Sequence, residues 1–311
     1  MPWTPDHLSV KGALASFHQA MEAGPTVWDK HAQTINSTTD TEALVFPGFM
    51  PIPREFLDSR QFQGARDFRY NVTNKEYELS LLVTRKNWED DQTGTINARF
   101  GESGEVWRTY KDSLLTTLLA NGNVAGNTGW DGVVYHGDSR TIGDSGTIDN
   151  NISGAAATGT TLTAAEWLTT INSVRTSFYG FNDDRGRPFN VQALTKLRAI
   201  IHPDQERGGY EAMNQMSFTG GSGATNEFGR AFLDGVDVLP YMASGDSDEL
   251  YFSALGSVRK PFIYQERTAL EVVVLGSADD VALNNGVMLL TRQRFVLTYG
   301  EPRRSILFTA T

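Results

Sequence analysis

Three adjacent acidic residues, Glu89, Asp90 and Asp91, form the cluster in this sequence that is best suited to chemistry. Carboxylates act as general acids and bases, and they supply oxygen ligands to divalent cations. Three consecutive side chains cannot all face one point, and no further carboxylate or histidine lies at a recognisable spacing from them. The pattern therefore favours a solvated turn or a salt bridge between subunits over a catalytic or metal-binding group.

An enzyme would be centred on His136, which has Asp138 two residues further on. A general base needs a nucleophile within hydrogen-bond reach, and the sequence has no Gly-x-Ser-x-Gly or comparable motif to supply one. The five histidines form no zinc-binding pair of the His-Glu-x-x-His type. The glycine-rich run 220–223 lacks the Gly-Lys-Ser/Thr of a nucleotide-binding loop. We therefore predict no catalytic residue, no metal site and no cofactor.

The composition restricts the class of partner. Among 311 residues, 27 Lys and Arg stand against 37 Asp and Glu, which gives a formal net charge of −10 and argues against broad electrostatic binding to nucleic acid. With no cysteine, disulfides and thiolate metal sites are excluded. No apolar run approaches the roughly 18 residues of a membrane span, and the N-terminus lacks a signal-peptide layout. We expect a soluble protein, made in a reducing cytoplasm, with no membrane partner.

An extended apolar arm is predicted near the N-terminus. A short helix is expected over residues 9–23, and the later run 46–53 holds three prolines, which block helix and central-strand hydrogen bonding. An extended apolar segment cannot bury its own side chains, so it must lie along the rest of the fold or along a neighbouring chain. We expect Phe46 and Phe49 to contact a neighbouring subunit.

A β-hairpin is predicted after this arm. Apolar residues alternate with polar ones over 68–72 and again over 77–83, and Thr73-Asn74-Lys75 is typical of a turn between them. An isolated hairpin is only marginally stable, so this one needs another surface to lie on. The residues expected to be buried anchors of that contact are Phe68, Tyr70, Tyr77 and Trp88.

The remainder of the chain mixes helices and strands. The strongest helical pattern spans 100–121, and the capping box Thr163 to Glu166 begins a second helix that continues to about Tyr179. Residues 137–160 are rich in Gly, Ser, Thr, Asn and Asp, which is typical of a loop. From residue 250 onwards the pattern is a series of short strands without an internal repeat, expected at 250–254, 262–266, 270–275, 287–290, 295–299 and 306–308. The whole chain is predicted to be α+β.

The order of several motifs resembles the major head subunit family of Mu-like phages. The similarity covers roughly residues 62–311, and its spacing is more informative than any one motif. The landmarks, in chain order, are Tyr70 to Glu78, Val83-Thr84-Arg85, Glu89 to Gly94, Trp130-Asp131-Gly132 before Tyr135-His136, Gly186-Arg187-Pro188 and Lys260 to Gln265.

The resemblance implies the Hong Kong 97-like major capsid fold of tailed phages. This fold has an N-terminal arm, an E-loop, a P-domain with a long spine helix, and an A-domain. The corresponding expectations for this chain are an N-terminal arm at 1–58, an E-loop β-hairpin at 59–98, a P-domain with its spine helix at 99–189, an A-domain at 190–257 and closing P-domain strands at 258–311.

The resemblance also implies a structural role in the virion. The chain would self-assemble, in the cytoplasm of a bacterial host, into hexamers and pentamers of an icosahedral phage head that encloses double-stranded DNA without sequence-specific binding. The expected partners are further copies of the chain, a scaffold protein and a portal, with a decoration protein as an additional candidate. Two alternatives stay open: a tail or adhesin-type binding module, and a hydrolase that uses His136 in a pocket shared with the acidic cluster.

Overall fold

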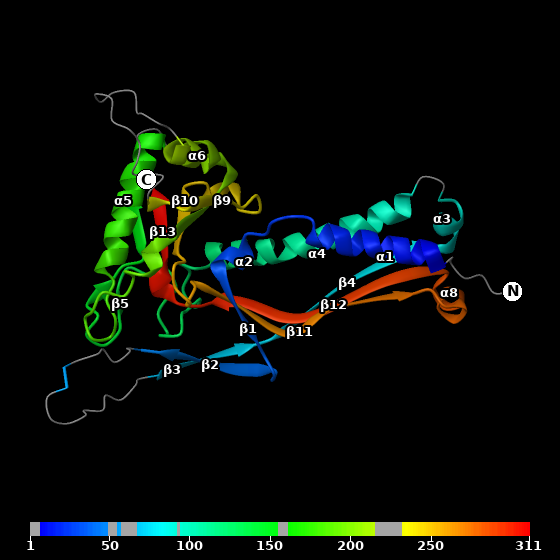
Figure 1. Ribbon diagram of the computed structural model, residues 1–311, viewed down its shortest axis with the longest axis horizontal. Helices are drawn as coiled ribbons and strands as arrows, with labels where there is room; N and C mark the ends of the chain where they lie inside the picture. Colours follow the sequence, from blue (N-terminus) through cyan, green and yellow to red (C-terminus); the bar gives the residue numbers. More distant parts are fainter. Residues whose placement is uncertain (1–6, 49–54, 57–66, 92–93, 155–160, 215–231) are drawn as a thin grey trace.

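The computed structural model describes residues 7–48, 55–56, 67–91, 94–154, 161–214 and 232–311. Figure 1 shows a long part, built on one helix and a narrow sheet, beside a more compact part built on a second sheet. The protein therefore mixes helices and sheets in two layered units, as the α+β prediction required.

The long part is a four-stranded sheet of order β1-β11-β12-β4, packed against the 26-residue helix α4 (Thr95–Ala120). Helix α1 (His7–Glu22) runs along α4 (Figure 1). The strands are β1 (Ala32–Asn36), β11 (Phe262–Leu275), β12 (Gly286–Tyr299) and β4 (Lys75–Thr84). Within this sheet, β1 pairs in parallel with β11, and the other two pairings are antiparallel.

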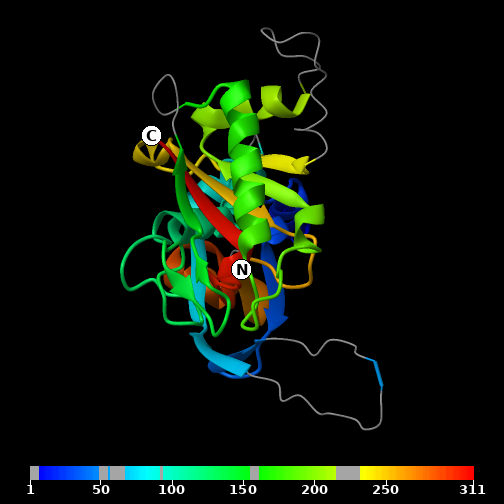
Figure 2. The ribbon, with the colours of Figure 1, turned by 90° about the vertical axis from the view of Figure 1, so that its left-hand side faces the viewer.

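The compact part is a five-stranded sheet of order β7-β13-β10-β8-β9. Helix α5 (Ala164–Gly180) crosses one face of this sheet, as Figure 2 shows, and α6 (Glu206–Asn214) packs beside it. The strands are β7 (Asn151–Gly154), β13 (Ser305–Ala310), β10 (Glu249–Ala254), β8 (Leu197–Ile201) and β9 (Gly235–Val238). Between helix and sheet lies a core that includes Trp167 and Phe252, both fully buried.

Shorter elements connect and extend these layers. They are α2 (Trp28–His31), β2 (Thr41–Pro47), β3 (Asp67–Thr73), α3 (Arg85–Glu89), β5 (Arg140–Thr141), β6 (Thr147–Ile148), α8 (Ala278–Asn284) and the 3-10 turns η1 (Ala193–Thr195), η2 (Pro203–Gln205), η3 (Ser244–Asp246) and η4 (Pro302–Arg304). β2 and β3 form a hairpin that projects below the body in Figure 1.

The three helices predicted from periodicity and capping are confirmed. The long one begins at Thr95 rather than at residue 100, because the Asp91 carboxylate accepts the otherwise unpaired N–H groups of its first turn. The capping box between Thr163 and Glu166 is present and starts α5. In the predicted loop at 137–160, the described residues 137–154 contain three short strands, one of which forms an edge of the five-stranded sheet.

The predicted hairpin with its turn at Thr73-Asn74-Lys75 is wrong. β3 pairs with β2, whereas β4 pairs with β12, so the chain continues from β3 into β4 with only a break at Asn74. The period-two pattern located both strands, but alternation does not say which strand is the partner. Asn74 is buried and fully hydrogen-bonded, which makes it a junction rather than an exposed turn residue.

The C-terminal strands are longer than the sequence indicates. The short runs expected at 262–266 and 270–275 are one 14-residue strand, β11, and those at 287–290 and 295–299 are one strand, β12. A register shift between Glu266 and Glu271 interrupts the alternation in β11, so the pattern appeared as two runs. The glycine-rich run 220–223 and Phe49 lie outside the described residues.

Candidate subunit-contact surfaces

The acidic cluster is part of the structure that starts α4. Asp91 accepts hydrogen bonds from the backbone N–H groups of Thr95 and Ile96, each at 3.0 Å, and Glu89 forms an ion pair with Arg85 at 2.8 Å. A carboxylate at this position satisfies orphan donors and complements the helix dipole. In the described part of the chain, no group of three His, Asp or Glu side chains could hold a metal ion. The cluster therefore has a structural explanation in its own chain.

His136 lies inside the protein, with 1% of its surface exposed. Its Nε2 is 2.9 Å from the Ser305 hydroxyl, and burial, together with the nearby Arg140 charge, lowers the pKa of His136 to about 3. Its backbone N–H donates to Gly122, just beyond the end of α4, whereas the acidic cluster precedes the start of that helix. A 26-residue helix is about 39 Å long. The pocket that a hydrolase would need is therefore not assembled.

Three of the predicted contact aromatics belong to one cluster around the same chain's Trp130, and two of them contact its ring directly. Phe46 stacks on its indole at a centroid distance of 5.6 Å, Phe68 lies at 4.5 Å, and Tyr70 contacts Phe46 at 6.4 Å. These contacts attach the β2–β3 hairpin to the body. Whether the same residues also touch a neighbouring subunit stays a prediction. Trp130 was recognised in the sequence only as a landmark, although a tryptophan beside a Gly-rich turn is a plausible anchor for a projecting element.

The other two predicted anchors lie in the long part. Tyr77, on β4, packs between Tyr110 of α4 and Phe295 of β12, at centroid distances of 5.5 and 4.5 Å. Trp88 is partly buried against the cluster that joins α1, α4 and the sheet. An apolar groove of about 250 Å³ beside Tyr77 includes the exposed Val106. These residues are placed near surface that a neighbour could cover, and their contact role stays a prediction.

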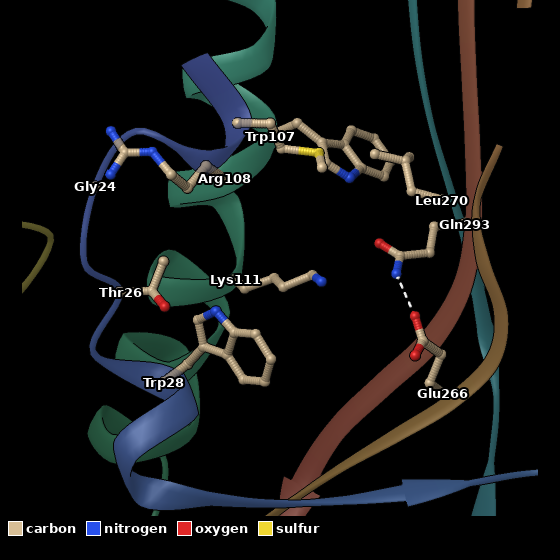
Figure 3. Close-up of a pocket in the computed structure, with 10 residues that line it drawn as sticks. Gly24, Thr26, Trp28, Trp107, Arg108, Lys111, Glu266, Leu270 and Gln293 are labelled. Carbon is tan, nitrogen blue, oxygen red and sulfur yellow. Dashed lines mark hydrogen bonds between the residues drawn. The ribbon is translucent and has the colours of Figure 1, made fainter. Parts of the chain in front are cut away.

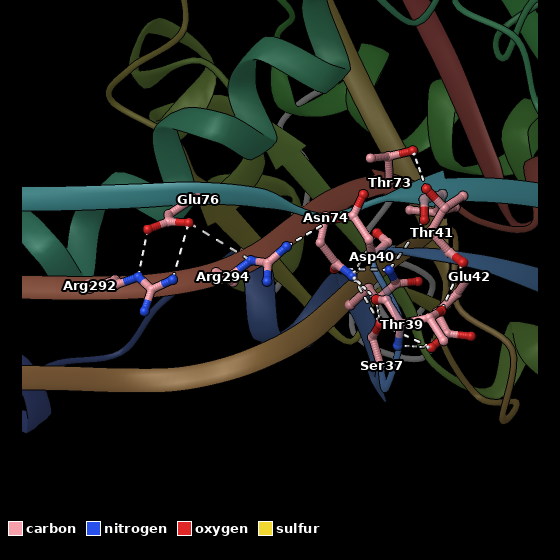
Figure 4. A network of polar contacts seen from close by, with 12 residues as sticks. Ser37, Thr39, Asp40, Thr41, Glu42, Thr73, Asn74, Glu76, Arg292 and Arg294 are labelled. Atoms are coloured by element: carbon pink, nitrogen blue, oxygen red, sulfur yellow. Dashed lines mark hydrogen bonds and ion pairs between the residues drawn. The ribbon is translucent and has the colours of Figure 1, made fainter.

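A polar junction fixes the root of the hairpin (Figure 4). The Asn74 amide nitrogen donates to the Ser37 hydroxyl at 2.9 Å and to the Thr39 carbonyl at 3.0 Å. Its oxygen accepts from Gln265 at 2.9 Å. Beside it, Glu42 accepts the backbone N–H groups of Thr38 and Thr39, and these bonds lower the pKa of Glu42 to about 2. The β1–β2 turn is thus bound to the place where β3 becomes β4.

Ion pairs on the exposed face continue this junction onto β12. Arg294 contacts Asp40 at 2.7 Å, and Arg292 contacts Glu76 at 2.5 Å (Figure 4). Exposed pairs of this kind contribute little to stability, because water and salt screen the two charges. They orient the hairpin root more than they stabilise the fold.

A second polar cluster joins the long and compact parts. Asp237 of β9 accepts Lys30 at 2.6 Å, His31 at 3.0 Å and Arg198 at 2.7 and 2.8 Å. Burial opposes ionisation of this carboxyl, but the hydrogen bonds from His31 and Arg198 outweigh it and hold the pKa of Asp237 well below its usual range. Lys30 and His31 come from α2, so this cluster attaches the N-terminal segment to the five-stranded sheet.

A cleft of about 360 Å³ opens between the α1–α2 connection, α4 and the long strands (Figure 3). Lys111 extends across it from α4, and its ammonium lies 5.0 Å from the Trp28 ring centroid and 4.7 Å from that of Tyr264. It donates to the Tyr264 hydroxyl at 3.0 Å. Burial lowers the pKa of Lys111 to about 8, with Glu266 acting in the opposite direction. Sequence reasoning did not identify this cleft, because its walls come from segments far apart in the chain.

No helix in the described part of the chain is both long and apolar enough to span a lipid bilayer.

Comparison with known proteins places the chain among phage head subunits. Residues 8–169 match the family described as Mu-like prophage major head subunit gpT. A stretch of 118 residues is 28% identical to the major capsid protein of Escherichia phage Mu, and covers 37% of this chain and 39% of that protein. Another, of 107 residues, is 23% identical to the Mu-like prophage FluMu major head subunit of Haemophilus influenzae, and covers 34% and 35%.

Solved capsid structures share the fold. The procapsid of bacteriophage JBD30 matches with a TM-score of 0.55 and 18% identity, over 98% of this chain and 75% of that one. The virus-like particle of Pyrococcus furiosus matches with a TM-score of 0.59 and 10% identity, over 96% and 98%. The capsid of cyanophage P-SCSP1u matches with a TM-score of 0.58 and 11% identity, over 92% and 88%. These likenesses show the Hong Kong 97-like capsid fold. Because the family model covers more than half of the sequence, the chain belongs to the Mu-like prophage major head subunit gpT family.

Proposed function

We propose that this chain is the shell-forming subunit of a phage head, which assembles into hexamers and pentamers around double-stranded DNA. The observation that carries the proposal is the β2–β3 hairpin, which projects from both layers of its own chain (Figure 1). Between its strands, Phe56 is 67% exposed. A large exposed aromatic side chain on a projecting arm is typical of a surface that a partner covers.

A closed ring of identical subunits would explain why the chain has a projecting hairpin. In a closed ring of identical chains, each subunit contacts its neighbours through two different surfaces, so an arm on one copy can lie on the body of the next. At the other end of the long part, α8 carries Leu283, which is 84% exposed. This end provides a second surface, suited to contacts between rings.

The proposed roles of the segments follow from this arrangement. The β2–β3 hairpin, residues 41–73, acts as the E-loop, which begins earlier in the chain than the interval 59–98 expected from sequence. α4 acts as the spine helix. The five-stranded sheet with α5 forms the A-domain, which then includes α5, β7 and β13 in addition to residues from the interval 190–257 expected from sequence. The segment before β2 acts as the N-terminal arm. A scaffold protein, a portal and a decoration protein are further proposed partners, supported by family membership rather than by a surface that we can assign.

The net charge of −10 is consistent with a subunit that forms the wall of a DNA-filled shell. A strongly basic lining would hold DNA through its phosphates, whereas an acidic subunit leaves packaged DNA free to move. The DNA contact is therefore proposed to be non-specific. No observation among the described residues favours a tail or adhesin-type module, and the burial of His136 disfavours the hydrolase.

Sedimentation and negative-stain microscopy of the purified chain, alone and with a co-expressed scaffold, test the proposal. We expect closed shells, or rings of five and six. A matched variant replaces residues 48–66 with a short Gly-Ser linker, which keeps both hairpin strands but removes the chain segment between them. It should fold, as judged by circular dichroism, and fail to assemble. Persistence of the unaltered chain as a monomer or dimer under both conditions contradicts the proposal.

A further inference from the structure

Two Asn-Gly pairs occur in the sequence, and each follows a helix. Asn121-Gly122 ends α4, whereas Asn285-Gly286 connects α8 to β12, at the end of the long part that lies away from the compact part (Figure 1). Before a glycine, the side-chain amide of asparagine is open to attack by the next backbone nitrogen, because glycine has no Cβ to hinder the approach. Attack also requires the peptide between the two residues to rotate, so reactivity depends on how firmly the fold holds that peptide.

The first pair is held on both sides of its peptide. The side-chain amide of Asn121 donates to the Thr117 carbonyl at 2.7 Å. The Gly122 N–H donates to the Leu119 carbonyl at 2.9 Å, and the Gly122 carbonyl accepts from the backbone N–H of His136 at 2.8 Å. Rotation of this peptide must break these bonds beside the buried His136 ring, which packs closely against Gly122.

The second pair is exposed and strained. Among the residues that the structure describes, Asn285 is the only non-glycine residue with a left-handed backbone (φ 49°, ψ 37°), in which the Cβ crowds the following carbonyl. Its own carbonyl accepts from the Arg85 N–H at 2.9 Å, and its side-chain amide has no hydrogen-bond partner in the described ranges. Because that bond pairs Asn285 with Arg85, strand alternation directs the Gly286 N–H away from β4. Rotation of this peptide therefore meets less resistance.

We propose that Asn285 is a site of self-modification, at which the Gly286 nitrogen attacks the side-chain carbonyl carbon of Asn285. A bond forms between Gly286 N and Asn285 Cγ, the bond between Cγ and Nδ2 breaks, and the proton from the Gly286 N–H leaves with Nδ2 as ammonia. Water then opens the cyclic imide at either of its carbonyls, which gives aspartate or isoaspartate. One water is consumed and one ammonia is released, so the reaction needs no oxidant or reductant.

Both products change the turn between α8 and β12. Isoaspartate adds a methylene group to the main chain and displaces the carbonyl that accepts the Arg85 N–H. Either product places a negative charge at the C-terminal end of α8, where the helix dipole disfavours it, in a helix that already carries Asp279 and Asp280. The exposed Leu283 lies on the same helix. The reaction therefore loosens this end of the long sheet and alters its surface as the protein ages.

Peptide mass spectrometry of the purified chain, incubated at mildly alkaline pH, tests the proposal. We expect the folded chain to gain the one mass unit of deamidation about tenfold faster at Asn285 than at Asn121, because two further hydrogen bonds must open at Asn121. In denaturant the two rates should become similar, since both pairs are Asn-Gly and only the fold distinguishes them. Equal rates in the folded chain, a faster reaction at Asn121, or an Asn285 that reacts only in denaturant would overturn the proposal.

Two variants provide a matched control and a second readout. Asn285→Gly keeps a residue that adopts the left-handed backbone freely but has no side chain to react, so this variant should fold and lose the mass gain at that position. Asn285→Asp supplies one product directly, and its thermal unfolding midpoint should lie below that of the unaltered chain. A midpoint equal to that of the unaltered chain contradicts the loosening of the turn. These readouts use the unassembled chain, so their outcome is independent of the shell function.

Discussion

The side-chain amide of Gln265 donates to the side-chain oxygen of Asn74 at 2.9 Å, in the interior of the junction where the projecting hairpin leaves the body. Through its nitrogen, Asn74 also donates to Ser37 and to the carbonyls of Thr39 and Asp40. One buried side chain therefore connects β11, the β1–β2 turn and the break between β3 and β4. The direction of the hairpin depends on this residue, since strand pairing alone leaves the break free to bend.

Replacing Asn74 should loosen this junction. Asn74→Ala leaves several buried polar groups without partners, and we expect the free energy of unfolding to fall by about 2 kcal/mol. Denaturant unfolding of the purified chain measures the loss. Asn71→Ala, at an exposed position of β3, is the control and should change stability by less than about 0.5 kcal/mol. Equal losses in the two variants would show that the junction is not specifically stabilising.

Two glycines of α4 should respond oppositely to the same substitution. A Cβ added at Gly104 would overlap the backbone carbonyl of Phe17 on α1, whereas at Gly101 the nearest atom is 3.9 Å away. Gly101→Ala should stabilise the chain by up to about 1 kcal/mol, through helix propensity. Gly104→Ala should destabilise it, because α1 must move away from α4. Thermal unfolding of both variants decides whether this close helix contact exists in solution.

The contacts around Asp237 should contribute much of the free energy that holds the long part and the compact part together. Asp237→Asn leaves Lys30 and Arg198 without their buried counter-charge, and we expect a loss of about 3 kcal/mol. Asp234→Asn removes only the exposed partner of Arg198 and should cost about 0–1 kcal/mol. Denaturant unfolding compares them, and a loss at Asp234 as large as at Asp237 would contradict the structure.

Burial of His136 predicts a pH dependence of stability. Its pKa is near 6.5 in the unfolded chain and about 3 in the folded one, so the unfolded state binds the proton first. The stability due to neutral His136 is fully present above pH 6.5 and declines as pH falls toward 3, by about 1.4 kcal/mol per pH unit. His136→Gln should remove that slope between pH 6 and 4.5, measured by denaturant titration, and a slope that persists in the variant would contradict the assignment to His136.

Of the three residues in the acidic cluster, only Asp91 should contribute measurably to the stability of the chain. Asp91→Ala removes the acceptor for the first N–H groups of α4 and should cost about 1 kcal/mol. Asp90→Ala keeps that acceptor and is the matched control. Addition of a chelator should not change the unfolding midpoint of either variant. A chelator-dependent midpoint in the unaltered chain would instead restore the metal-binding hypothesis for these carboxylates.

Local patterns in the sequence were sufficient to predict the helices and the positions of most strands. The stripe of apolar residues on α4 and the capping box at Thr163 act over three or four residues, so neither needs knowledge of distant contacts. The order of motifs also identified the family, because spacing along a chain survives when single residues change. The absence of a catalytic signal followed from residue types alone.

Strand partners and sites depended on the tertiary structure. Residues 68–83 had the alternation of two strands, yet only the fold decided that β3 pairs with β2 and β4 with β12. For the same reason, the sequence did not reveal the cluster around Asp237 or the cleft beside Lys111. The residues that form each of them come from segments more than a hundred residues apart. Periodicity reports which face of a strand is buried but carries no information about what covers it, and that choice is made by the packing of the whole chain.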